Sequence, residues 1–291
     1  MLTDIVVPGL TFGSIYALIA MSFNVSYRPT NVVNFAQGEL VMVGAMVVAA
    51  TSLGGLPWAL AALAVIVLVG GISLVEERIA VTPVLRRSSH ATGWVITTLA
   101  FSLIIGEVAG KLWTDQPRAV EPPAPLSLDR VELAGVGFNS YQAAVVVAAV
   151  LVMLVLQRID RTPLGCAMRA VAADRDGARL RGVDPSSLTR QSFFISGALA
   201  GLAGLLAAPL LLASLGMGLA LLIKGFATLA VGGIGSNKGA LLAGWTLGLV
   251  EAIGTNYVSP GLQNVVLFGF MLAFLLIRPS GVLGQKVMRH V

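Results

Sequence analysis

Residues Gln191–Ile223 read QSFFISGALAGLAGLLAAPLLLASLGMGLALLI, 33 positions without a formally charged side chain. Another uncharged run of 25 residues, Leu133–Gln157, precedes them in the chain. Because roughly 20 apolar residues cross the hydrocarbon core of a bilayer, each run predicts a membrane span. Segment 158–190 between the runs carries seven arginines and four aspartates. Short loops rich in Lys and Arg lie in the cytoplasm, so the sequence places this segment on the cytoplasmic side.

The composition of the whole chain supports a polytopic membrane protein of the all-α class. Of the 291 residues 56% are hydrophobic and only 11% are charged, whereas a soluble chain is about a quarter charged. The net charge of +5 gathers between the apolar runs, so positive-inside bias explains it and we expect no nucleic-acid partner. Cys166 is the only cysteine, which excludes an intrachain disulfide and a thiolate metal cluster.

The sequence also lacks the usual signatures of an enzyme. No lysine that could close a GxxxxGK[ST] phosphate loop is followed by Ser or Thr, so an ATP-driven process would need another chain to hydrolyse the nucleotide. The apolar runs contain no paired aspartates, HExxH pattern or Ser/His arrangement. We therefore expect no catalytic residue, no metal site and no cofactor.

The uncharged runs and their breaks predict eight to ten spans, with nine as the best count. Residues 40–75 are uncharged but too long for one crossing, and the turn signal SLGGLP at 52–57 divides them. Segment 76–93 follows as a cytoplasmic loop. Segment 114–138, with four prolines and a small excess of acids over bases, suits an external loop. We expect the whole chain, 1–291, to form one transmembrane domain.

A polar break stands beside the second span, in the stretch NVVNFAQGEL at residues 31–40. Asn34, Gln37, Gly38 and Glu39 lie within it. A discontinuous helix of this kind is tolerated at membrane depth only against protein or a water-filled path, which makes these four residues our first candidates for a translocation path. The alternative is a capped helix start at the cytoplasmic interface. A similar break, GGIGSNKGA at residues 232–240, occurs in the second half, as expected of a repeat-built transporter.

Lys224 and Glu251 are further candidates for the path, because both lie in apolar surroundings without a local partner. Intramembrane charges are rare and usually functional. The two residues either pair with each other across helices or face the pathway.

The basic segment contains a predicted docking helix, PLGCAMRAVAADRDGARLRG at residues 163–182. A proline stands near its start, the apolar residues Leu164, Met168 and Val171 follow at helical spacing, and Gly182 is a stop signal. A membrane protein that presents such a helix to the cytoplasm is expected to bind a soluble partner there.

Several motifs together resemble the membrane permeases of bacterial branched-chain amino acid ABC transporters. They are NVVNFAQGELVMVGA, the arginine-rich segment ending in ARLRGVD, FFISGALAGLAGLLAAP, VGGIGSNKGALLAG and LIRPSGVLG, which cover nearly the whole chain in the family's order. The chain is more similar to the H-type than to the M-type subunit of the permease pair. The resemblance implies a type II importer-like helical fold in the bacterial inner membrane.

The same resemblance implies a set of partners: a second permease subunit, two cytoplasmic ATPase subunits and an extracytoplasmic substrate-binding protein, besides membrane lipid. Segment 163–182 then matches the coupling segment, with Gly182 at its signature glycine. In this reading Leu164, Met168 and Val171 seat the helix. The residues expected to meet the ATPase are Arg169, Arg175, Arg179 and Arg181.

The substrate follows less directly from the resemblance. Branched-chain or related aliphatic amino acids are the leading expectation. Gln37 departs from the family pattern, in which many relatives carry histidine (NFAHGE), and paralogues transport urea or short amides. A urea or amide permease is therefore one alternative, and an ion-coupled secondary transporter, which would work alone, is another.

Overall fold

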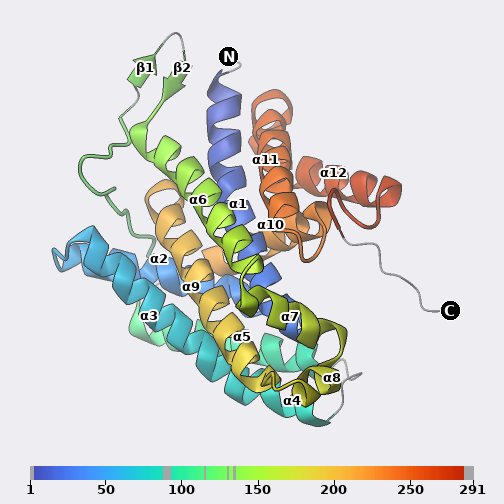
Figure 1. The fold of residues 1–291 in the computed structure, drawn as a ribbon. Helices are drawn as coiled ribbons and strands as arrows, with labels where there is room; N and C mark the ends of the chain where they lie inside the picture. Colours follow the sequence, from blue (N-terminus) through green and yellow to red (C-terminus); the bar gives the residue numbers. More distant parts are fainter. Residues whose placement is uncertain (1–2, 88–92, 115, 130, 134–135, 285–291) are drawn as a thin grey trace. The chain divides into compact units, whose positions relative to one another are not determined.

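The chain is helical almost throughout in the computed structural model, which describes residues 3–87, 93–114, 116–129, 131–133 and 136–284 (Figure 1). The longer helices are α1 (Thr3–Thr30), α2 (Gln37–Leu53), α3 (Trp58–Glu76), α5 (Gly93–Leu112), α6 (Ser140–Asp160), α9 (Pro185–Leu211), α10 (Met217–Gly232), α11 (Asn237–Ile253) and α12 (Gln263–Ile277). Shorter ones are α4 (Thr82–Arg87), α7 (Pro163–Ala173) and α8 (Arg175–Leu180). One antiparallel hairpin pairs β1 (Val131–Leu133) with β2 (Val136–Phe138), within segment 114–138.

Helix length and composition identify five to six candidate membrane spans within the described residues, and the count of about nine stays a prediction. Five helices are long and apolar enough to cross a membrane: Ile5–Thr30, Trp58–Leu85, Gly93–Leu112, Ser140–Asp160 and Pro185–Leu211. A sixth candidate is the bent pair α10 and α11, and α2 and α12 are shorter apolar helices. The sequence-based count of nine also includes the two shorter apolar helices and both arms of the bent pair. The all-α polytopic class itself is confirmed.

The predicted loop after α3 starts too early. The charges of Glu76, Glu77 and Arg78 resemble a helix end, but the helix continues through a π-helical segment, Glu77–Val81, into α4. The side chains of Glu76 and Glu77 are buried, so these charges do not mark the membrane surface. Residues 88–92 of the predicted loop lie outside the described residues.

Two compact units make up the chain. One contains residues 1–21, 122–157 and 224–291, and the other contains residues 22–121 and 158–223. The single domain 1–291 stays a prediction beside these two packing units.

In the unit with residues 22–121 and 158–223, α9 packs most extensively against α2 and α3. Small residues allow this approach: a Cβ on Gly44 of α2 would lie 2.6 Å from the Cα of Gly201 on α9. Helix association in lipid depends on such close packing, because apolar burial gives little driving force there.

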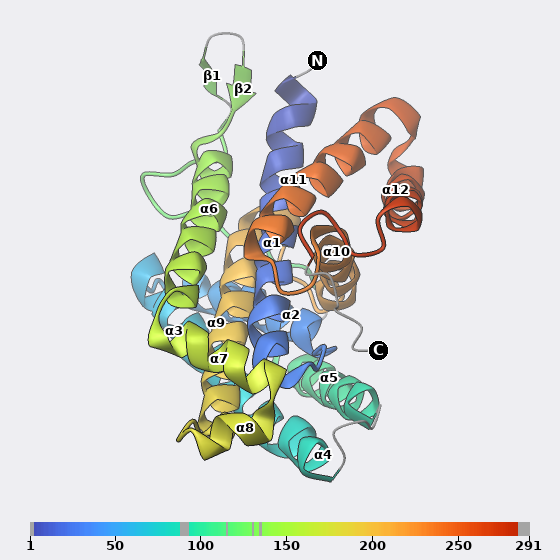
Figure 2. The same cartoon turned by 45° about the vertical axis from the view of Figure 1, so that its right-hand side comes forward.

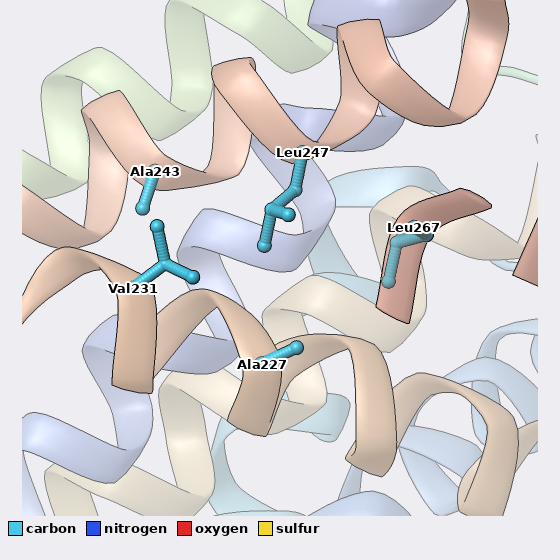
Figure 3. Close-up of a cluster of buried hydrophobic side chains, with 5 residues drawn as sticks. All are labelled: Ala227, Val231, Ala243, Leu247 and Leu267. Atoms are coloured by element: carbon cyan, nitrogen blue, oxygen red, sulfur yellow. The ribbon is translucent and has the colours of Figure 1, made fainter. Parts of the chain in front are cut away.

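In the other unit, the N-terminal part of α1 crosses α11 at glycines. Gly9 and Gly13 meet Gly248 and Gly244, and a Cβ on Gly13 would lie 2.9 Å from the Cα of Trp245. A separate apolar cluster joins α10, α11 and α12, as Figure 3 shows. It consists of Ala227, Val231, Ala243, Leu247 and Leu267, all nearly inaccessible to solvent.

Candidate functional site

The predicted break between the first two spans is present as a stretch of non-helical chain. Helix α1 ends at Thr30, Asn31 adopts a positive φ of 54°, and α2 begins at Gln37. The Asn34 side-chain oxygen accepts a hydrogen bond from the Ala36 amide at 2.8 Å. Ala36, the N-cap residue of α2, provides no side-chain cap. Asn34, two residues before Ala36, thus provides the side-chain contact at the start of α2, and both interpretations of this break stay predictions.

Gln37 is the centre of a buried polar network that joins three helices. Its Nε2 donates to Ser22 Oγ on α1 at 2.7 Å and lies 3.2 Å from both the carbonyl and the hydroxyl oxygen of Ser196 on α9. The Ser196 hydroxyl donates in turn to the Ser22 carbonyl at 2.7 Å. Asn34 Nδ2 lies 3.3 Å from Gln37 Oε1. Since Asn34, Gln37, Ser22 and Ser196 are fully buried, the network fixes the start of α2 against α1 and α9.

Glu76 on α3 extends this network, and the sequence did not single it out. Its Oε2 accepts a hydrogen bond from Asn34 Nδ2 at 2.8 Å. The side chain is fully buried. The signal available in the sequence was its position, at the end of 36 uncharged residues.

Gly38 and Glu39 face a different direction, toward the N-terminal turn of α10. A Cβ on Gly38 would lie 2.6 Å from Leu222 Cβ, so only glycine lets the two helices approach this closely. The Glu39 carboxylate lies against Gly218, where an added Cβ would be 3.0 Å from its oxygens. Glu39 is only partly buried. Glu39 is the only charged residue of the four, and its carboxylate has no hydrogen-bond partner among the residues that the structure describes.

The second predicted break also separates two helices. Gly233 and Gly235 have positive φ angles of 91° and 87°, and the Ser236 hydroxyl caps α11 by accepting from the Gly239 amide at 3.0 Å. The chain bends by 119° between the two arms, Met217–Gly232 and Asn237–Val258. Helices α2 and α11 both have 17 residues and begin after their break with a buried side-chain amide, Gln37 or Asn237. The similarity noted in the sequence therefore extends to helix length and to the first residue.

Lys224 and Glu251 form an ion pair, which is the first of the two alternatives left open by the sequence. Lys224 Nζ lies 2.5 Å from Glu251 Oε1, and the side chains are only 15% and 12% exposed. The Tyr16 hydroxyl donates to Glu251 Oε2 at 2.8 Å and lies 3.1 Å from Lys224 Nζ. The two charges neutralise each other, so a contact between either residue and a substrate would compete with this pair.

The predicted docking helix is two helices. Asp174 follows the last residue of α7 and caps α8, so the single helix predicted over residues 163–182 is wrong. One carboxylate oxygen, Asp174 Oδ1, accepts from the amides of both Asp176 and Gly177, at 3.1 and 3.0 Å. Two amides at the start of α8 thereby gain a partner, which stabilises a helix restart there.

The apolar face of these helices packs inside the protein. Met168 and Val171 belong to a buried cluster with Ala178 and Leu188, and Leu164 packs against its edge. Leu188 lies in the first turns of α9, and Figure 2 shows α7 and α8 beside this end of α9. This face therefore seats the segment on its own chain, so it is already occupied before any partner binds.

The arginines differ in what they contact. Arg169 Nη1 donates to the Asp160 carbonyl at 2.7 Å, and Arg179 pairs with Asp176 at 3.3 Å on the surface. Arg181 is exposed. Partial burial, followed by repulsion from Arg179, lowers the pKa of Arg175. Arg179 and Arg181 thus present positive charge at the exposed surface of the segment.

Gly182 adopts a positive φ of 82°, which favours glycine. No atom crowds this position, since an added Cβ would meet nothing within 4 Å among the described residues. Backbone conformation, and not space, selects glycine here. Nearby, Leu180 is 90% exposed.

Comparison with known proteins places this arrangement in a family. Residues 5–275 match the family described as "Branched-chain amino acid transport system / permease component". The chain belongs to this permease family. The high-affinity branched-chain amino acid transport system permease protein BraD of Pseudomonas aeruginosa is 32% identical, over 98% of this chain and 96% of the relative. The permease protein LivH of Escherichia coli, from a system of the same description, is 30% identical over 97% and 96%. No solved structure matches the chain.

Family membership confirms the main predictions from the sequence. The chain is a multi-pass membrane protein and the permease component of a branched-chain amino acid ABC transport system of the bacterial inner membrane. As a permease component it is a transport subunit and not an enzyme, and it works with the other components of such a system.

Proposed function

We propose that this permease forms, with a second permease subunit, the inner-membrane path for branched-chain or related aliphatic amino acids. Two separate ATPase subunits drive it, and an extracytoplasmic binding protein delivers the substrate. The two relatives described above are both named for high-affinity branched-chain amino acid transport, and they align with nearly the full length of this chain. That full-length likeness is the support for the substrate class.

The break at residues 31–36 is the proposed path element of this subunit. Asn34 and Gln37 hold its shape through buried hydrogen bonds, and Gly38 allows the start of α10 to come close. Glu39 presents a carboxylate that no hydrogen bond occupies among the described residues. A branched-chain amino acid carries an ammonium group that this carboxylate would attract, and its side chain needs an otherwise apolar surface. The partly exposed Glu39 carboxylate is the observation that carries this assignment.

The second break has a supporting role in this proposal. Lys224 and Glu251 neutralise each other and join α10 to α11, with Tyr16 of α1 as a third member. In this pair each charge neutralises the other, so neither adds a net charge beside the path.

Energy transfer would run from the ATPase subunits through segment 158–190 into α9. The exposed Leu180 and Arg181 stand at the turn between α8 and α9, where a partner can contact them. Met168 and Val171 pack on Leu188 of α9, and the same helix carries Ser196, which contacts Gln37. Leu188 and Ser196 are eight residues apart, about 12 Å along a helix. A displacement of α8 would therefore be transmitted to the break by α9, and all three lie in the same packing unit.

Uptake by the reconstituted complex tests this function. Glu39→Gln removes the proposed ammonium contact while keeping the side chain's shape, and Glu107→Gln on α5 is a matched control because Glu107 is exposed on its helix. We expect Glu39→Gln to raise the KM for leucine about tenfold or more, the effect of losing a charged hydrogen bond of about 1.5–3 kcal/mol, with little change in the control. Equal uptake by both variants would remove Glu39 from the path. Strong competition by urea, and none by valine, would point instead to the urea or amide alternative.

A further inference from the structure

Glu76 is the most enclosed acidic side chain of the described residues that lacks a cationic partner. It lies on α3, within the candidate span Trp58–Leu85, and its exposure is 0%. Asn34 Nδ2 donates to one carboxyl oxygen, Oε2, at 2.8 Å. The other oxygen, Oε1, has no hydrogen-bond partner among the described residues.

We propose that Glu76 is a neutral carboxylic acid in the folded permease and acts as the positioning residue for Asn34. An isolated carboxylate in a low-dielectric interior is so unfavourable that the group takes up a proton instead. In a membrane span this preference is stronger, because charged side chains there need partners or water.

Among the described residues, an ionised Glu76 carboxylate would have one hydrogen bond, from Asn34, and no cationic partner. On its own helix Ser73, one turn away, is fully buried, and its hydroxyl packs at Gly197 of α9. Asn34 and Gln37, from the break and from α2, are uncharged amides. The neighbouring Glu77 is itself acidic and bonds to the Thr82 hydroxyl. Arg175, on α8, interacts electrostatically with Glu77.

Glu251 provides an internal contrast in the same chain. Its carboxylate has the Lys224 ammonium at 2.5 Å and the Tyr16 hydroxyl at 2.8 Å. An ion pair with hydrogen bonds on both oxygens stabilises the charged form. The two buried glutamates therefore hold different states: Glu251 is ionised and paired, whereas Glu76 is protonated.

The neutral acid has a specific use at this position. With the proton on Oε1, the carbonyl oxygen Oε2 accepts from the Asn34 amide and fixes its orientation. Asn34 Oδ1 is then directed to the Ala36 amide, 2.8 Å away, and its Nδ2 toward Gln37. Glu76 thus holds the break in shape without adding a charge beside the proposed path. The role of Glu76 in transport rests on the proposed function, because it assumes that the break belongs to the path.

Infrared spectroscopy of the purified permease at neutral pH tests the protonation state. The difference between wild type and Glu76→Gln is expected to show loss of one carbonyl band of a protonated carboxylic acid. The matched difference for Glu251→Gln should instead show loss of carboxylate bands. In Asn34→Ala the Glu76 acid band should persist but move to higher frequency, because its carbonyl loses a hydrogen bond. Loss of carboxylate bands in Glu76→Gln would overturn the proposal.

Uptake measurements test the positioning role separately. Glu76→Gln keeps a neutral carbonyl acceptor, so we expect leucine uptake within about twofold of wild type. Glu76→Ala should lose several-fold, because the buried Asn34 amide loses its shorter hydrogen bond and keeps only the one to Gln37 at 3.3 Å. Failure of Glu76→Gln to assemble or to transport would contradict a neutral acid at this site. The infrared result does not depend on the substrate, so a wrong substrate assignment would leave it intact, and a missing acid band would leave the transport assignment intact.

Discussion

The Lys224–Glu251 pair allows a quantitative test of how this permease tolerates buried charge. Lys224 Nζ and Glu251 Oε1 lie 2.5 Å apart, and the side chains are only 15% and 12% exposed. Removing one member leaves the other charge buried and unpaired, at a cost of about 3–5 kcal/mol. Replacing both with neutral groups of similar size is often close to neutral. We therefore expect Lys224→Met and Glu251→Gln to be strongly destabilising singly and largely compensated in combination.

The magnitude can be followed by thermal unfolding of the detergent-solubilised protein. At about 2–4 °C per kcal/mol for a domain of 150–250 residues, each single variant should lower the Tm by roughly 6–20 °C. The double variant should recover most of that loss, which gives a coupling energy of about 3 kcal/mol or more in the cycle. The Tyr16 hydroxyl can still donate to the amide oxygen that Glu251→Gln introduces, which should limit any further loss. Additive Tm changes in the double variant would refute the reasoning, because they would show that the two charges do not compensate each other.

Three further predictions concern the topology and the cytoplasmic segment. In a Cys166→Ser background, Ser127→Cys should react with an impermeant thiol reagent in whole cells or spheroplasts and Ser187→Cys should not; labelling of the second site in intact cells would contradict the topology. Met168→Asp buries a charge in the apolar cluster beside α9, so it should lower the Tm and abolish substrate-stimulated ATPase activity of the reconstituted complex. The control Ala170→Asp, on the exposed face of α7, should leave the Tm unchanged. Equal Tm values for the two variants would place Met168 outside the core. Gly182→Val forces a β-branched residue to a φ of 82°, which costs about 1–2 kcal/mol of backbone strain and should weaken the stimulation of ATPase activity. Gly182→Asn should have a smaller effect, because asparagine tolerates this conformation. The reverse order would show that φ does not select glycine here.

The fold class and the two breaks could be predicted because their signals are local. Uncharged runs longer than about 20 residues indicate spans, and clusters of Gly, Asn and Ser indicate the breaks. The pairing of Lys224 with Glu251 was one of two stated alternatives, since neither charge has a local partner.

The remaining features depend on contacts that the sequence does not display. Glu76 resembles a loop residue because Glu77 and Arg78 follow it, and its burial depends on Asn34, 42 positions away. The spacing of Leu164, Met168 and Val171 shows that one face is apolar but not what covers it, and in the structure α9 covers it. The span number depends on tertiary structure as well, because hydropathy does not show whether a short or bent apolar helix crosses the membrane. Asp174 is a local signal that the single-helix prediction overlooks, since an aspartate before RDGARL is a typical N-cap.

The most direct test of the central claim is ATP-dependent uptake of labelled leucine by proteoliposomes that contain this permease, its second permease, the two ATPase subunits and the binding protein. The account predicts uptake only when all components and ATP are present, with competition by isoleucine and valine but not by urea. Uptake by this subunit alone, driven by an ion gradient without ATPase subunits, would contradict it.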